Sequence, residues 1–421
     1  MLDGPDGALA PDLLTEVRAR FAHVEDCPYQ GERAFFENAG GALTLRSVLE
    51  TSARHAAVPD NPGRDNPAGR ALVDVIERGK DDLRLLLGAS GGTVIAGESG
   101  TELIFRVIRA ACLGAGGGIV LGSTIEHPAT RSAAARWSEA AGMEHRLIAH
   151  DAERGLVTPE AYAEAMTPEV RVATILHTSP VTGMGMDLTG IGRAIRAVSP
   201  DCVVVVDGIQ HAAHGPADVE AAGVDAYVIS PYKCFSRHGY GLAWLSERAA
   251  ALPHDHLAGA PGEPWELGTR DAGAYACFSE VVRYLEWLGG EVSEETEARA
   301  MLLAAGRAIH DHEARLCHAA MFGTGNRKGL AELPGLHVLG GESEAREGLV
   351  SVWSDDVASE EIVARLNEAG IRTHIRKADH YSANALEPLG LKDCVRISFC
   401  HYNSEAEIAR MLGAMAEIAG G

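Results

Sequence analysis

An aspartate and a lysine follow two successive apolar segments near the middle of this chain. Four consecutive valines, residues 203–206, lead into Asp207, and the apolar residues 226–229 are followed within four positions by Lys233. A run of four valines is typical of a strand buried on both faces of a parallel sheet. Open α/β sheets bind their ligands outside the carboxyl ends of the strands. We therefore expect Asp207 and Lys233 at one ligand-binding edge.

A carboxylate and a lysine amine at such an edge suit pyridoxal phosphate (PLP). The lysine forms a Schiff base with this cofactor, and the carboxylate keeps the pyridine nitrogen protonated, so that the ring accepts electrons. Spacing alone leaves two simpler interpretations open. Lys233 can be a solvated loop residue, and Asp207 can cap a helix.

Two neighbouring motifs favour the cofactor. Gly100 and Thr101 follow a short apolar segment and begin a predicted helix, where backbone N–H groups and a hydroxyl can bind phosphate. His127 lies between a predicted strand and a predicted helix, a position that suits a ring stacked on a planar cofactor. A core histidine is the commoner interpretation of any single histidine.

The pattern of apolar residues predicts an alternation of helices and strands from about residue 70 to residue 245, which indicates βαβ units and a largely parallel sheet. The predicted strands lie near residues 93–96, 118–121, 146–149, 172–177, 203–206, 226–229 and 241–245. A helical stretch over 271–321 follows, then strands near 336–339, 348–353 and 394–400 and helices near 358–369 and 404–418. Residues 12–23 are predicted to be helical and residues 60–70 to form an irregular polar loop.

This alternation predicts three regions. Residues 41–295 are expected to form a large PLP-binding domain, and residues 296–421 a small α+β C-terminal domain. Residues 1–40 are expected to pack with the small domain.

The composition argues against several classes of protein. The chain has 421 residues and a net charge of −22. Partners rich in phosphate need a basic surface, so neither a nucleic acid nor an anionic membrane is expected. No apolar stretch approaches the roughly 18 residues of a membrane span, and the N-terminus lacks the basic and apolar segments of a signal peptide. We therefore expect a cytoplasmic protein.

The cysteines and histidines do not suggest a metal site. Eight cysteines are scattered along the chain without a CxxC pair, which favours free thiols over disulfides or zinc ligands. The one mixed cluster consists of His310, His312, Cys317 and His318. Because residues two apart on a helix do not share a face, we interpret this cluster as a polar helix surface.

Several motifs together resemble the class V, fold-type I PLP enzymes, and above all their cysteine desulfurase-like branch. In chain order they are Asn38-Ala39-Gly40-Gly41, Gly100-Thr101-Glu102, Glu126-His127, Asp207-Gly208-Ile209-Gln210-His211, Ser230-Pro231-Tyr232-Lys233, Trp265-Glu266-Leu267-Gly268-Thr269, Arg396 and His401-Tyr402-Asn403. The similarity covers nearly the whole chain. It implies an α/β fold with a mostly parallel seven-stranded sheet in the large domain and a smaller α+β C-terminal domain.

The resemblance also implies a role for each matching residue. Lys233 carries the Schiff base and moves protons, Asp207 pairs with the pyridine nitrogen, Gln210 donates to the phenolic oxygen, and His127 stacks on the ring. Gly100, Thr101 and Ser230 hold the phosphate with help from His211, and Thr269 reaches the phosphate of a partner subunit, which implies a homodimer. Arg396 binds the substrate carboxylate with its planar guanidinium, and Asn38 is expected near the substrate.

The chain departs from the desulfurase pattern in two places. Where desulfurases carry a nucleophilic cysteine on a mobile loop, this chain reads His380-Tyr381-Ser382-Ala383. Where the family has an Asn-Val-x-Gly turn beside the cofactor, it reads Ser179-Pro180-Val181-Thr182-Gly183. Because proline has no N–H to donate, the surroundings of the phenolic oxygen are expected to differ.

These features predict a PLP-dependent, desulfurase-like lyase that acts on an α-amino acid by β-elimination and forms no persulfide. Tyr381 or His380 is the expected proton donor to the leaving group. Transamination and epimerisation stay open, because reaction choice depends on the orientation of bonds around Cα. A non-catalytic partner protein with this fold is a further alternative, which the intact Asp207, Gln210 and Lys233 disfavour.

Overall fold

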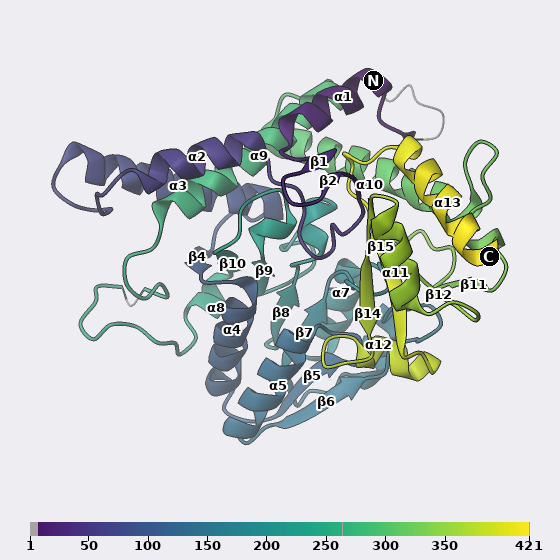
Figure 1. The fold of residues 1–421 in the computed structure, drawn as a ribbon. Coiled ribbons are helices and arrows are strands. Elements are labelled where there is room, and N and C mark those ends of the chain that lie inside the picture. The colour runs from purple at the N-terminus through teal and green to yellow at the C-terminus, as the bar shows by residue number, and fades with distance from the viewer. Residues whose placement is uncertain (1–6, 263, 421) are drawn as a thin grey trace.

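Seven strands form the central sheet of the computed structural model, which describes residues 7–262 and 264–420 (Figure 1). They are β4 (Thr93–Gly97), β5 (Ile119–Ser123), β6 (Glu144–Ile148), β7 (Val170–Leu176), β8 (Val203–Asp207), β9 (Ala226–Ile229) and β10 (Gly241–Leu245). Their order is β4-β10-β9-β8-β7-β5-β6, and only β10 runs antiparallel to its neighbours. The predicted mostly parallel, seven-stranded sheet is confirmed.

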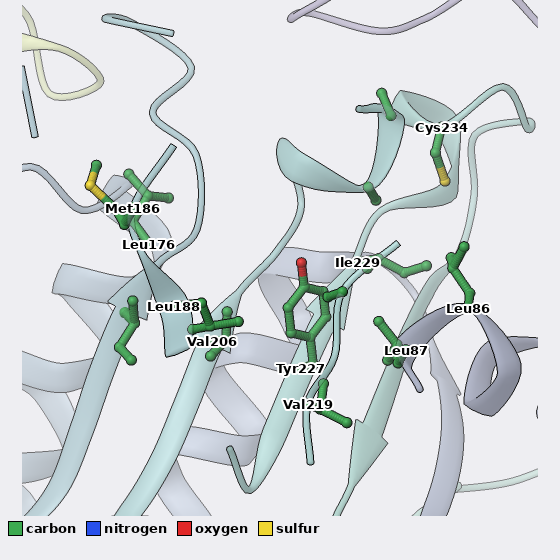
Figure 2. Close-up of a cluster of buried hydrophobic side chains, with 14 of the residues drawn as sticks. Leu86, Leu87, Leu176, Met186, Leu188, Val206, Val219, Tyr227, Ile229 and Cys234 are labelled. Atoms are coloured by element: carbon green, nitrogen blue, oxygen red, sulfur yellow. The ribbon is translucent and has the colours of Figure 1, made fainter. Parts of the chain in front are cut away.

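The central strands bury side chains on both faces. Val203 and Val205 of β8 pack with α4 (Gly100–Gly114) and α5 (Pro128–Ala140) on one face. Val204 and Val206 belong to the core cluster on the other face. Figure 2 shows part of that second face, where Val206 lies beside Leu188, and Tyr227 and Ile229 of β9 lie toward Leu86 and Leu87 of α3 (Pro67–Leu87). The alternation follows from the two-residue period of a strand, and it explains why the valine run is continuous.

Two predicted boundaries were wrong. The helical stretch over 271–321 is two helices, α9 (Ala272–Val292) and α10 (Ala298–Phe322). The first ends because Ser293 is extended, and the second begins where the Glu297 side chain accepts a bond from the Ala300 N–H. α3 begins at Pro67, inside the predicted irregular loop. Asn66 caps it by accepting the Gly69 N–H at 2.7 Å, and proline suits the first helical position.

A second, four-stranded antiparallel sheet lies beside the central one, drawn green to yellow in Figure 1. Its strands are β11 (Leu336–Val338), β12 (Leu349–Ser354), β14 (His374–Lys377) and β15 (Asp393–Ser398), in the order β11-β12-β15-β14. One face packs on α10, α11 (Ser359–Glu368) and α13 (Glu405–Gly420). The other face carries Ser351 and Arg396, which bond to the carbonyls of Val181 and Pro180 beyond β7. This face therefore looks toward the carboxyl edge of the central sheet.

β14 has no counterpart among the predicted strands. Its sequence, His-Ile-Arg-Lys, lacks a clear apolar alternation, and no residue in it is fully buried. Its hydrogen bonds to β15 hold it in place. The strand is therefore specified by a pairing partner more distant in the chain and not by its own composition.

The remaining elements surround these two sheets. They are α1 (Pro11–Arg20), β1 (Asp26–Cys27), β2 (Gly31–Glu32), β3 (Ala34–Phe35), α2 (Arg46–Ala56), α6 (Pro159–Ala165), α7 (Leu188–Val198), α8 (Glu247–Ala250), β13 (Ile371–Arg372) and α12 (Ala383–Leu386). The N-terminal strand β3 pairs in parallel with β13, next to the second sheet. Within the described residues, no helix has the length and apolar character to cross a membrane.

Candidate active site

Asp207 ends the central strand β8 and is almost fully buried, with 2% of its surface exposed. Its Oδ2 accepts a hydrogen bond from Thr130 Oγ1 of α5 at 3.0 Å, and its Oδ1 accepts one from the Ile209 N–H at 3.2 Å. These two donors fix the orientation of the carboxylate. A buried negative charge favours a cationic partner, as a protonated pyridine nitrogen would be.

Lys233 ends the short 3-10 turn Pro231–Lys233 that follows β9. Its Nζ donates to Gln210 Oε1 at 3.3 Å. Burial lowers the pKa of Lys233 to about 8; the positive charge of Arg396 also lowers it, while Asp207 opposes the shift. A larger fraction of the amine is therefore neutral and nucleophilic near neutral pH than for an exposed lysine.

Three of the predicted phosphate residues, Gly100, Thr101 and Ser230, come together from the ends of two strands, β4 and β9. α4 begins at Gly100, and Ser99 caps it by accepting the Glu102 N–H at 3.1 Å. A Cβ atom at position 100 would overlap Ser230 Oγ and the Ile209 side chain, so only glycine fits there. Thr101 is exposed beside it. Helix N–H groups and two hydroxyls in this place suit a phosphate.

His127 lies at the first turn of α5. Its Nδ1 accepts the Ala129 N–H at 3.2 Å, so the neutral ring carries its proton on Nε2. Burial lowers the pKa of His127, and the Asp207 charge opposes this shift. The ring is therefore mainly neutral at physiological pH, as stacking on an aromatic cofactor requires.

Arg396 extends from β15 and has only 3% of its surface exposed. Its Nη1 donates to the Pro180 carbonyl at 3.0 Å, and its Nε has no partner within the described residues. Burial lowers the pKa of Arg396 to about 10, and the charge of Arg376 adds to that effect. The proline in the altered turn thus supplies a carbonyl that orients this arginine.

Two predicted site residues have contacts other than the implied ones, and a third lies exposed. Asn38 is buried, donates to the Ser398 carbonyl at 2.7 Å and accepts from the Tyr402 hydroxyl, so it anchors the N-terminal segment to β15. The His211 ring stacks on His177 with centroids 3.6 Å apart, and its Nδ1 lies 3.1 Å from the Glu347 carboxylate. Thr269 is exposed; its neighbour Arg270 forms an ion pair with Glu98, close to Gly100.

The structure also adds residues that the sequence did not single out for the site. His214 Nδ1 lies 2.6 Å from Glu313 Oε2, and His214 Nε2 lies 3.5 Å from Gln210 Nε2. Burial acts to lower the pKa of His214, but the charge and hydrogen bond of Glu313 together with the charge of Glu347 raise this pKa overall; burial raises the pKa of Glu313. A buried polar chain therefore runs from Lys233 through Gln210 to Glu313. Glu313 lies far away in sequence on α10, where nothing in the local pattern marks it.

The loop before α12 brings Tyr381 and His380 to the site. The Tyr381 ring centroid lies 6.3 Å from that of His127 and 4.1 Å from that of His380. Asn384 donates to the Thr124 carbonyl at 2.8 Å, which ties this loop to the end of β5. Tyr381 is 47% exposed, so its hydroxyl is accessible to a bound molecule.

The cysteines near the site are buried thiols. Cys234 and Cys394 are almost fully buried, and burial raises their pKa values to about 12 and about 11. Burial also raises the pKa of Cys400. A nucleophilic cysteine needs a lowered pKa and exposure, and these three have neither. Within the described part of the chain, no group of three or more His, Cys, Asp or Glu side chains is arranged to hold a metal ion.

A family model described as aminotransferase class-V matches residues 34–307 and 296–411, which together cover most of the chain. The chain belongs to the aminotransferase class-V family. It is a PLP-dependent enzyme, and the residues at the ends of β4, β8 and β9 fit that cofactor: an amine with a lowered pKa, a buried carboxylate and a tight turn rich in donors.

Three comparisons illustrate the similarity. A probable cysteine desulfurase 2 of Mycobacterium leprae is 24% identical over 425 residues, which cover 97% of each chain. A nonribosomal peptide synthetase-like enzyme of Aspergillus fumigatus, fsqF, is 25% identical over 89% of this chain, which spans only 25% of that protein. The apo structure of the cysteine desulfurase from Thermococcus onnurineus NA1 superimposes with a TM-score of 0.82 at 20% identity and covers 100% of both chains. The fold-type I architecture is thereby confirmed.

Proposed function

We propose that this enzyme is a lyase that removes a β-substituent from an α-amino acid without forming a cysteine persulfide. One observation carries the proposal. The loop beside His127 presents Tyr381 and His380, while Cys234 and Cys394 are buried thiols whose pKa values are raised by burial. On the loop where a desulfurase carries its cysteine, this chain thus carries two possible proton donors, Tyr381 and His380.

The chain's own residues supply binding, orientation and proton transfer. Lys233 would hold PLP covalently, and the bound cofactor would supply a ring that withdraws electrons from Cα of the substrate. Lys233, with its pKa near 8, is the base that takes the proton from Cα. Asp207, held by Thr130, stabilises positive charge at the ring nitrogen.

Substrate orientation falls to Arg396. Its Nη1 donates to the Pro180 carbonyl, which fixes the orientation of the guanidinium and leaves the Nη2 group to bind a carboxylate. The glycine turn after Asn38 comes within contact distance of this free group, since a Cβ atom at Gly40 would lie 3.4 Å from Arg396 Nη2. Asn38 supports this site by anchoring the turn.

A proton for the departing group comes from Tyr381 or His380. Tyr381 is the stronger candidate, because its ring lies next to that of His127, over the place where we expect the cofactor ring. His380 contacts Tyr381 and can return its proton. The accessible phenol replaces the thiol as the acid.

We further propose that the enzyme works as a homodimer. Thr269 is exposed on the segment between α8 and α9, which extends from the central sheet in Figure 1. An exposed hydroxyl on such an extension suits a contact with the phosphate of a neighbouring subunit. We expect the Thr269→Val variant to lose both dimerisation and cofactor affinity. Analytical ultracentrifugation measures the dimer, and absorbance measures the bound cofactor.

The reaction is tested by incubating the PLP-loaded enzyme with a panel of amino acids. We expect ammonia and a 2-oxo acid to form while the cofactor stays as PLP. Conversion of the cofactor to pyridoxamine phosphate would instead establish transamination, and loss of optical activity without ammonia would establish epimerisation. A protein that gains no visible absorbance band with PLP would be a non-catalytic member of the family.

A further inference from the structure

A second arginine, Arg376, lies on the same face of the four-stranded sheet as Arg396. The antiparallel register pairs His374 with Arg396 and Arg376 with Cys394. Because residues two apart on a strand share a face, Arg376 and Arg396 are diagonal neighbours on adjacent strands. Long side chains in that arrangement reach the same space, which here is the carboxyl edge of the central sheet.

Neither of these arginines forms an ion pair within the described residues. Arg376 donates through Nε to Ser382 Oγ at 2.9 Å, and Arg396 donates to the Pro180 carbonyl. The nearby carboxylate of Glu37 is already engaged, with Arg372 Nε at 2.7 Å and His374 Nδ1 at 3.1 Å. Burial lowers the pKa of Arg376 and the charge of Asp379 opposes that shift, but Asp379 accepts the Tyr381 N–H at 2.8 Å and forms no ion pair with Arg376. Two partly or fully buried guanidinium groups thus share one region without an ion-paired carboxylate among the described residues.

The electrostatics agree with this geometry. Burial lowers the pKa of Arg376, and its charge lowers the pKa values of both Arg396 and Lys233. Buried cations that are not paired destabilise a protein unless an anion binds beside them. One substrate carboxylate can neutralise one guanidinium. The second guanidinium then lacks an anion.

The cofactor phosphate does not supply that anion. The residues that suit it, Gly100 and Ser230, lie at the ends of β4 and β9 in the central sheet. Arg376 lies instead beside the loop of the proposed proton donor, since its Cζ is 5.8 Å from the centre of the Tyr381 ring. That is the side on which the proposed function places the substrate's β-substituent.

We infer that Arg376 binds a second anionic group, and that the substrate is an α-amino acid whose departing β-substituent itself carries a negative charge; L-aspartate, which has no such leaving group, mimics its charge and serves as a binding probe. Arg396 then binds the α-carboxylate and Arg376 the side-chain anion. Two arginines on one rigid sheet face set the distance between the two anions, which gives selectivity for short acidic side chains. The inference rests on the proposed function, because that function places an amino acid between Arg396 and Lys233.

The test compares L-aspartate with L-asparagine, which has the same shape without the side-chain charge. Both are titrated into the PLP-loaded enzyme, and binding is followed by the change in cofactor absorbance and by calorimetry. We expect the wild-type enzyme to bind L-aspartate at least about tenfold more tightly, as a charge-assisted arginine–carboxylate contact provides. Arg376→Gln should remove this preference and leave L-asparagine affinity nearly unchanged.

Lys377→Gln is the matched control. Lys377 follows Arg376 on β14, is exposed, and points to the opposite face. Its substitution by glutamine therefore removes one positive charge without changing a residue of the site. This variant should keep the preference for L-aspartate. An equal loss in Lys377→Gln would show that overall charge, and not Arg376, selects the substrate, and would overturn the inference.

Other outcomes separate the inference from the proposed function. Equal affinity of the wild-type enzyme for both amino acids, with a normal absorbance change, would overturn the inference and leave the proposed function standing. Equal weakening of both ligands in Arg376→Gln would place Arg376 at the α-carboxylate and would also overturn it. A wild-type protein that binds PLP but responds to neither amino acid would contradict the inference and the α-amino-acid substrate together.

Discussion

The two sides of the site are built in different ways. The cofactor side lies at the ends of hydrogen-bonded neighbouring strands, where Asp207 of β8 stands directly beside Val228 of β9, five residues before Lys233. The substrate side lies on the separate four-stranded sheet, and its Arg396 contacts the segment that follows β7 of the central sheet. There, Arg396 meets the Pro180 carbonyl at 3.0 Å, and Ser351 donates to the Val181 carbonyl at 2.7 Å.

This difference separates two properties of the enzyme. Adjacent strands are held at a fixed spacing of about 4.8 Å by their backbone hydrogen bonds, so the cofactor side keeps its geometry whatever the second sheet does. The substrate side depends on how two packed layers meet. We therefore expect variants on the first side to change cofactor chemistry and variants on the second side to change substrate binding.

Lys233→Ala gives the largest expected effect. The variant should lose its covalent bond to the cofactor and all turnover, because no other amine of the described site reaches the same position. Borohydride reduction followed by mass spectrometry measures the bond, and Lys377→Ala, at the exposed end of β14, is the control. A reducible adduct in Lys233→Ala protein would mean that the cofactor side lies elsewhere.

Asp207→Asn should retain the cofactor but slow turnover by at least about a hundredfold, since a neutral amide cannot stabilise charge at the ring nitrogen. Thr130 can still donate to the new amide oxygen, so the fold should persist. Cofactor content by absorbance and kcat with the best amino acid are the measurements. Turnover within a few fold of wild type would remove Asp207 from the chemistry.

Arg396→Lys should act on the other side. We expect substrate affinity to fall by about tenfold or more with cofactor binding unchanged, because an ammonium lacks the planar fork that fits a carboxylate. Amino-acid titrations read by cofactor absorbance give the substrate affinity, and dialysis gives the cofactor affinity. If both affinities fall together, the two sides are not separable and the comparison fails.

The pH dependence of cofactor attachment should report the surroundings of Lys233. Only the neutral amine attacks PLP, and burial lowers its pKa to about 8 from an ordinary value of 10.5. The attachment rate to the apoprotein should therefore rise with pH and level off above about 8. Asp207→Asn should move the midpoint lower, since the aspartate charge favours the ammonium. A wild-type rate that keeps rising to pH 10 would contradict this environment.

Single substitutions of Cys234, Cys394 and Cys400 by alanine or serine should leave kcat unchanged, the smallest effect of the series. These thiols are buried and their pKa values are raised, so they do not act as nucleophiles. Loss of turnover with the cofactor still bound, together with a persulfide on one of them, would restore the desulfurase mechanism. Tyr381→Phe is the companion variant, in which turnover is expected to fall.

Much of the cofactor side followed from the sequence. The valines at 203–206 indicate a strand buried on both faces, and the chain then turns at Asp207 because a polar side chain ends the apolar run. The resemblance added the roles of Gln210, Ser230 and Gly100, and the structure brings all of them to one edge. Such a prediction works because parallel strands align their carboxyl ends through local, periodic hydrogen bonding.

The substrate side and the buried acid–histidine pair could be found only in the tertiary structure. Arg376 lies on a strand without apolar alternation, held by its pairing with β15, and Glu313 approaches His214 from a helix about a hundred residues away. No periodicity in either segment marks these contacts. These contacts depend on side-chain packing between two layers, and therefore on the shape of the whole core. Asp207 and Lys233, in contrast, are positioned by the backbone geometry of strands that their own apolar sequences specify.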